Sequence, residues 1–151
     1  MKNNIEISLV LCLVLLVSPL NAEDWSGFLG PKRNGQAFPN IETFVKEPQL
    51  IWSAPVGEGF SGPIVFAETV FLHHRNQNSE EITAFALKSG KVNWKKSFAT
   101  TYKDDFSRGD GPRSTPAVNK TAIVSISPDG LLRALNTTNG QLLWEKDLIS
   151  E

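Results

Sequence analysis

The stretch AFALKSGKVNW, residues 84–94, is repeated with variations as ALNTTNGQLLW, residues 134–144. Both copies carry alanine, glycine and tryptophan at the same relative positions: Ala84 and Ala134, Gly90 and Gly140, Trp94 and Trp144. Upstream, SGPIVFAETVFL (residues 61–72) aligns in the same way with STPAVNKTAIVS (residues 114–125). Repetition at a period of roughly 50 residues is typical of propellers and solenoids, in which each repeat is one structural unit.

Each repeat is expected to contain about four strands. Short runs rich in β-branched and aromatic residues alternate with Gly, Pro, Asn and Ser, which is the pattern of strands and turns rather than of long helices. Ser89-Gly90 and Asn139-Gly140 are predicted to form two-residue hairpin turns, because Asn-Gly pairs favour the positive φ angles of such turns. Four strands make one propeller blade. The predicted fold class is therefore all-β, a partial β-propeller of about two four-stranded blades.

A third tryptophan continues the pattern upstream. Trp52, within LIWSAPVG (residues 50–57), precedes a new repeat as Trp94 does, but no first half of a blade comes before it. Two blades do not close a ring, since propellers typically have about 4 to 8. We therefore expect a truncated copy of a longer propeller, or a unit that assembles with further blades or a protein partner. Its uncovered strand edges and sheet faces favour self-association.

The first 22 residues have the layout of a signal peptide. Lys2 precedes an apolar run over residues 7–17, and the small Ala22 precedes two acidic residues. Cleavage near Ala22 predicts a periplasmic or secreted protein with no stable membrane span, and it removes Cys12, the only cysteine. An uncleaved anchor is the alternative, although the run is shorter than the roughly 20 residues of a membrane span. The predicted organisation is a signal peptide (1–22), an N-terminal segment leading into the repeats (23–48) and the repeats (49–151).

The charge balance does not favour a polyanionic partner. The chain has 15 basic and 16 acidic residues, a formal net charge of −1. Nucleic-acid binding requires a clustered positive field. We therefore expect no nucleic-acid partner.

The repeated Ala, Gly and Trp positions resemble those of the pyrroloquinoline-quinone-like (PQQ-like) β-propeller repeat family, within the quinoprotein alcohol dehydrogenase-like superfamily. The family phrase is similar to Ala-x-Asp-x-x-Thr-Gly-x-x-x-Trp. Here Ala86 and Asn136 replace the aspartate, and Ser89 and Asn139 replace the threonine. The segments over residues 24–35 and 104–118 resemble the exported bacterial branch of the family. The resemblance implies that five residues dock neighbouring blades: Trp52, Gly90, Trp94, Gly140 and Trp144.

The resemblance leaves several functions open. The family includes quinone-dependent alcohol and sugar dehydrogenases, outer-membrane assembly scaffolds and exported propellers of unknown role. In the dehydrogenases PQQ and calcium lie over the centre of the closed ring, so these cofactors are expected only in a completed propeller, and no catalytic residue carries over. We expect a non-catalytic binding or assembly scaffold. The alternatives are a fragment of a PQQ-dependent dehydrogenase and a truncated, non-functional copy of a longer propeller.

A polar loop between the repeats is the candidate binding segment for a ligand or partner. Its predicted site residues are Tyr102, Asp104, Asp105, Arg108, Asp110 and Arg113. The carboxylates do not follow the spacing of a calcium-binding loop, and the two arginines suggest internal ion pairs. His73 and His74 are adjacent on a predicted strand, so their rings should point to opposite faces. We therefore expect no metal site.

Overall fold

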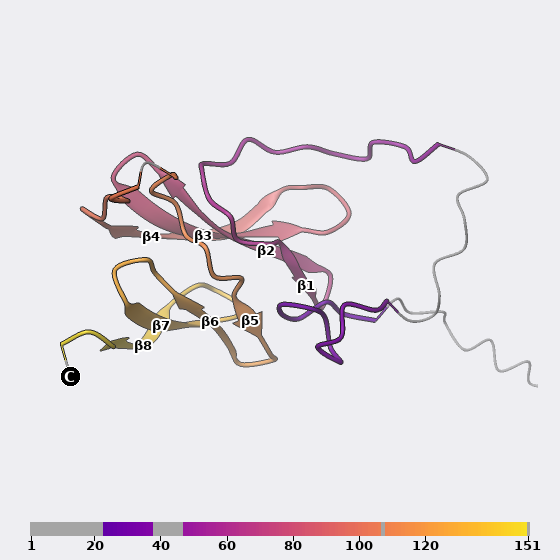
Figure 1. Ribbon diagram of the computed structural model, residues 1–151. Helices are drawn as coiled ribbons and strands as arrows, with labels where there is room; N and C mark the ends of the chain where they lie inside the picture. Colours follow the sequence, from indigo (N-terminus) through magenta and orange to yellow (C-terminus); the bar gives the residue numbers. More distant parts are fainter. Residues whose placement is uncertain (1–22, 38–46, 107, 151) are drawn as a thin grey trace, which may run out of the picture.

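The computed structural model describes residues 23–37, 47–106 and 108–150, so the predicted signal peptide with Cys12 lies outside the described residues. The chain forms two four-stranded antiparallel sheets whose strands neighbour one another in sequence order (Figure 1). The first sheet contains β1 (Ile64–Phe66), β2 (Thr69–Asn76), β3 (Ser79–Ala86) and β4 (Val92–Ala99). The second contains β5 (Ala117–Val118), β6 (Ala122–Ile126), β7 (Leu131–Asn136) and β8 (Leu142–Asp147). The predicted all-β class with two four-stranded blades is confirmed.

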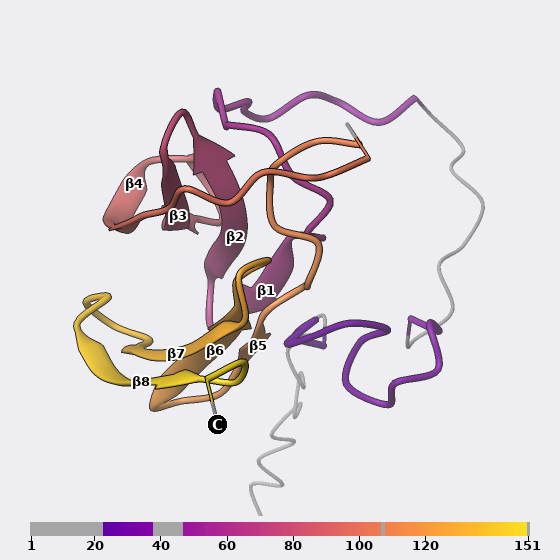
Figure 2. The ribbon, with the colours of Figure 1, turned by 60° about the vertical axis from the view of Figure 1, so that its left-hand side comes forward.

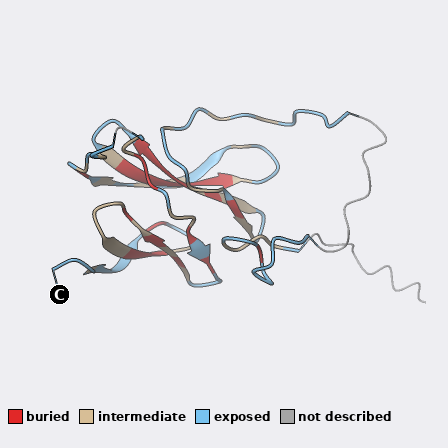
Figure 3. Ribbon diagram, viewed as in Figure 1, coloured by how far each residue is buried: buried red, intermediate tan, exposed pale blue. Residues whose placement is uncertain are grey.

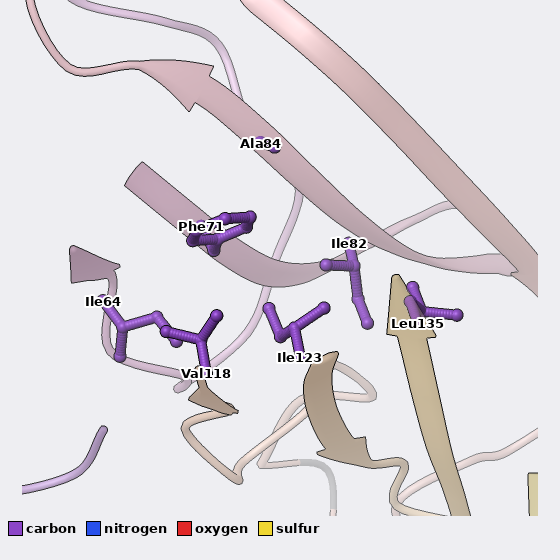
Figure 4. Close-up of a cluster of buried hydrophobic side chains, with 7 residues drawn as sticks. All are labelled: Ile64, Phe71, Ile82, Ala84, Val118, Ile123 and Leu135. Atoms are coloured by element: carbon purple, nitrogen blue, oxygen red, sulfur yellow. The ribbon is translucent and has the colours of Figure 1, made fainter. Parts of the chain in front are cut away.

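The hydrophobic core lies between the two blades, which face each other as separate layers in both views (Figures 1 and 2). Residues two apart on a strand share one face of a sheet, and this alternation selects the core side chains. Figure 4 shows the cluster, in which the first blade contributes four residues and the second contributes three: Ile64, Phe71, Ile82, Ala84, Val118, Ile123 and Leu135. Burial is concentrated in the middle strands of each blade, whereas β8 is largely exposed (Figure 3).

The N-terminal segment connects the innermost strands of the two blades. The Trp25 carbonyl accepts a hydrogen bond from the Val65 amide in β1 at 2.9 Å, and the next carbonyl, of Ser26, accepts one from the Val118 amide in β5 at 2.9 Å. Figure 1 shows this indigo segment beside β1 and β5. The segment therefore joins the two blades at their inner edge.

The predicted two-residue hairpin turns are not the turns observed. The loop between β3 and β4 is closed by a hydrogen bond from the Ala86 amide to the Lys91 carbonyl, and Gly90 has φ +67° while Ser89 is not among the residues with positive φ. The second blade repeats this loop, with φ +69° at Gly140. A register shift in the same strand pair accommodates the longer loop. A single left-handed glycine, rather than two positive-φ residues, thus makes each turn.

Candidate functional site

The polar loop is anchored to the first blade by Arg75, which is 2% exposed. Its Nε donates to the Gln77 carbonyl at 2.7 Å, and its Nη1 donates to the carbonyls of Tyr102 and Asp110 at 2.8 and 3.0 Å. One buried guanidinium therefore holds both ends of the loop against β2. Arg75 is not among the residues that the sequence predicted as functional.

Asp104 is the centre of the loop, and its side chain is only 3% exposed. It accepts hydrogen bonds from the Arg108 backbone amide at 2.7 Å and from Arg113 Nη2 at 2.9 Å, and Arg108 Nη2 lies 3.6 Å away. The backbone hydrogen bond from Arg108, followed by the charges of the two arginines, lowers the pKa of Asp104 below its ordinary value. The suggested internal ion pairs are therefore present.

Asp110 is held in a similar way. Its carboxylate accepts from Lys103 Nζ at 2.7 Å and from the Asp104 backbone amide at 2.8 Å. The hydrogen bond from Lys103 is the main cause that lowers the pKa of Asp110, with a further contribution from the charge of Arg75. Both loop carboxylates are thus engaged by cationic groups and amides, while Asp105 is exposed to solvent.

Two aromatic rings lie beside the loop and are exposed. Phe60 is 60% exposed and Phe106 is 74% exposed. The guanidinium of Arg113 lies 5.6 Å from the Phe60 ring centroid, and that of Arg108 lies 4.6 Å from the Phe106 centroid. Arg113 also lies 3.4 Å from the Tyr102 hydroxyl. The structure thus groups five of the six predicted loop residues, and a ligand or partner role for the loop stays a prediction.

Equivalent positions of the two repeats touch each other near this loop. Arg113 occupies the repeat position of Phe60, and the two side chains are in contact. Thr115 occupies the repeat position of Gly62, and its Oγ1 accepts a hydrogen bond from the Gly62 amide at 3.0 Å. Residues related by a rotation approach one another only near the rotation axis. The loop therefore lies on the inner side of the pair of blades.

The second group of predicted residues forms a repeated Trp–Gly contact. The Trp94 ring, from β4 of the first blade, lies over Gly140 of the second, where an added Cβ would be 2.9 Å from Trp94 Cδ2. Its Nε1 donates to the Thr137 carbonyl at 3.0 Å. Positive φ at Gly140 and the missing Cβ are both required by this approach. The contact joins the two blades.

The same contact occurs one repeat earlier. The Trp52 ring lies over Gly90, where an added Cβ would be 2.6 Å from Trp52 Cδ2, and Nε1 donates to the Leu87 carbonyl at 2.7 Å. Trp52 also stacks on Phe85 with centroids 6.1 Å apart. In both cases the accepting carbonyl lies three residues before the glycine. Trp144, the third tryptophan of the series, is 46% exposed.

The two histidines of β2 point to opposite faces of the first blade. His73 Nε2 lies 3.3 Å from Glu80 Oε2, on the face toward the second blade, and His74 Nε2 lies 3.0 Å from Thr83 Oγ1 on the other face. His74 Nδ1 accepts a hydrogen bond from the Gly57 amide at 3.1 Å. Among the residues that the structure describes, no group of three or more His, Cys, Asp or Glu side chains is arranged to hold a metal ion.

Lowering the pH from about 8 to about 5 is expected to destabilise the wild-type chain more than a His74→Asn variant. Burial lowers the pKa of His74 below its ordinary value of about 6.5, although Glu81 opposes this. The unfolded chain therefore binds this proton more readily. The contribution of His74 to stability is complete above about pH 6.5 and is lost as the pH falls toward the lowered pKa of the native state.

The asparagine variant is the matched control because its Oδ1 can accept from the Gly57 amide without titrating. Urea unfolding of both proteins at the two pH values measures the difference. The same pH dependence in both would contradict the assignment.

The chain is similar in sequence to part of a curated outer membrane protein assembly factor. No protein-family model matches it. It is 34% identical over 108 residues to the outer membrane protein assembly factor BamB of Shewanella oneidensis, a match that covers 64% of this chain and 26% of that protein. The chain therefore spans about a quarter of the length of this curated relative.

Two solved structures are similar in part. One is a europium-containing methanol dehydrogenase, with a TM-score of 0.47, 21% identity and coverage of 66% of this chain and 18% of the other. The other is BamB from Moraxella catarrhalis, with a TM-score of 0.36, 12% identity and coverage of 60% and 22%.

Proposed function

Because the chain is built from PQQ-like β-propeller repeats, we propose that it is an exported, non-catalytic scaffold that binds or assembles protein through its second blade. The observation that carries the proposal is a sheet face of the second blade, here called the free face. It is formed by the exposed Trp144, the partly buried Val124 and Leu132, and the buried Ala134. Strand pairing places Ala134 opposite both Val124 and Trp144, so these side chains share one side of the sheet.

In the first blade the equivalent face is covered. Phe71 and Ile82 hold the repeat positions of Val124 and Leu132, and each is 1% exposed because the second blade packs on them. Val124 and Leu132 are only partly buried, and Trp144 is exposed. An apolar face of a blade with an exposed tryptophan is the kind of surface that binds another protein.

The two Trp–Gly contacts define the partner chemistry that fits this face. Trp52 and Trp94 each lie over a left-handed glycine and donate to the carbonyl three residues before it. Trp144 has the same sequence context as Trp94. We therefore propose that the free face binds a β-hairpin with a glycine in its turn, as another propeller repeat would supply.

The name of the curated relative supports a scaffold role. The curated relative is by name an outer membrane protein assembly factor. The described part of the chain has no helix of the length and hydrophobicity needed to cross a membrane. The signal-like sequence of residues 1–22 supports a periplasmic or secreted location as part of the proposal.

The carboxylates of the polar loop do not fit a calcium site. Calcium requires several oxygen ligands, but Asp104 and Asp110 are occupied by Arg108, Arg113 and Lys103. A cation would have to displace these pairs, so we derive no chemistry through PQQ or calcium.

The proposal is tested with a hairpin peptide that copies residues 131–144 of this chain. We expect it to bind the exported protein, and Trp144→Ala to weaken that binding roughly 30-fold, the loss typical of a central interface tryptophan. A peptide with the Gly140→Ala substitution should not bind, because its methyl group would meet the indole. Binding is measured by calorimetry.

The control variant is Phe28→Ala, which removes another exposed aromatic ring from the N-terminal segment and should leave binding unchanged. Equal affinity of the wild-type protein for the glycine and alanine peptides would overturn the proposal. Dye-linked alcohol oxidation after addition of PQQ and calcium would also overturn it.

A further inference from the structure

Two of the three tryptophan segments of the chain are closely similar in sequence, and only the first of these two is docked. Residues 50–52 read Leu-Ile-Trp and residues 142–144 read Leu-Leu-Trp. The first tryptophan lies over Gly90 of the first blade, whereas the second, in β8, is 46% exposed. The first blade therefore has a binding site that suits both segments.

The segment that occupies this site, residues 50–58 and here called the arm, is held at few points. Trp52 contacts Gly90 and Phe85, Gly57 donates to His74, and Glu58 forms a two-hydrogen-bond bridge with Arg75. Between these points the arm forms no strand, and its Leu50 and Ile51 are 83% and 81% exposed.

The arm also leaves the outer face of the first blade incompletely covered. A cavity of about 390 Å³ lies between the arm and the sheet, lined by residues that include Val56, His74, Glu81, Phe85 and Lys95. Between the two blades, by contrast, the side that carries Trp94 is packed with buried side chains. The outer face of the first blade therefore has room for more side chains than the arm supplies.

We infer that β8 of a second copy of this chain replaces the arm, with its Trp144 over Gly90 and its indole N–H on the Leu87 carbonyl. The inference rests on the proposed function, because it names the partner of the free face. The contact joins different surfaces of the two copies and is therefore head-to-tail, which closes a ring if the rotation allows.

Two tryptophan substitutions should change assembly in opposite directions. Trp52→Ala frees the site and is expected to lower the protein concentration needed for assembly by about tenfold, if the arm occupies the site roughly nine-tenths of the time. Trp144→Ala removes the exchanging segment and should keep the protein monomeric. Sedimentation velocity of the exported chain over a concentration series measures both, with Phe28→Ala as the unchanged control.

Crosslinking tests the geometry without disturbing either tryptophan. Lys88→Cys and Leu143→Cys, each in a Cys12→Ser background, are mixed and treated with a short bifunctional thiol reagent. We expect the mixed 88–143 product to dominate over both like pairs, and Trp144→Ala to remove it.

Monomeric behaviour of wild type and Trp52→Ala at every concentration, or like pairs that crosslink as readily as mixed pairs, would overturn the inference. Assembly that persists in Trp144→Ala would do the same. If the hairpin peptide still binds the free face in that case, the proposed function stands and only the second copy as partner is wrong.

Discussion

Replacing Gly140 by alanine is expected to lower the free energy of unfolding by about 3 kcal/mol, from two separate causes. A residue with a Cβ is strained at φ +69°, by about 1–2 kcal/mol. The methyl group would also overlap the indole of Trp94, and forcing extra volume into a packed contact costs about 1–3 kcal/mol. Urea unfolding followed by circular dichroism measures the loss.

Gly35→Ala is the matched control for this substitution. Gly35 has φ +71°, but an added Cβ would meet only Leu29 Cδ2 at 3.6 Å, an ordinary contact. The Gly35→Ala substitution should therefore lower the free energy of unfolding by the backbone strain alone. In a Trp94→Ala background the additional cost at Gly140 should disappear, because the ring that it meets is gone. Equal losses for the two glycines would show that the indole contact does not contribute.

Replacing Arg75 by methionine is expected to lower the free energy of unfolding by about 3 kcal/mol, although the methionine side chain fills much of the same space. Three backbone carbonyls would lose a donor, and those of Tyr102 and Asp110 belong to partly buried residues. An acceptor left unsatisfied away from water costs about 1–3 kcal/mol. Because two of these carbonyls belong to the polar loop, hydrogen exchange over residues 102–113 should also become faster. Urea unfolding and hydrogen-exchange mass spectrometry measure the two effects.

Arg108→Met is the control, since Arg108 lies in the same loop with its side chain 65% exposed. Exposed ion pairs contribute about 0–1 kcal/mol to stability, so Arg108→Met should lower the free energy of unfolding only slightly. If the Arg75 and Arg108 variants unfold at the same urea concentration, or if the loop exchanges as slowly in the Arg75 variant as in wild type, Arg75 is not its anchor.

The two blades could be predicted from the sequence because the same residue pattern occurs in both, so that each copy supports the assignment of the other. The matched Ala, Gly and Trp positions identified both outer hairpins, and the offset upstream identified both inner ones. The turn type was wrong because Ser89-Gly90 and Asn139-Gly140 fit either a two-residue turn or a longer loop with one left-handed glycine. The choice depends on strand register, which pairs Ala84 with Trp94 across the sheet.

The polar loop, too, could be predicted only in part. Its charged residues and their ion pairs could be anticipated from the alternation of Asp and Arg over residues 104–113. Its anchor could not, because Arg75 lies 27 residues before Tyr102 and nothing in its own strand indicates its partners. The exposure of Phe60 and Phe106 was equally hidden, since aromatic residues in this chain are otherwise mostly packing elements.

The sequence by itself determined the structural unit of this protein: a four-stranded blade ending in a tryptophan, with a glycine where the next indole must approach. That much is local, because strand alternation and the conformational freedom of glycine act over a few residues. Only the tertiary structure decided which tryptophan meets which glycine. Trp52 and Trp94 find a glycine because the chain folds one next to each of them, while Trp144 of the described chain remains exposed. The difference lies in the arrangement of the blades, since Trp94 and Trp144 share the same spacing from an alanine and a glycine.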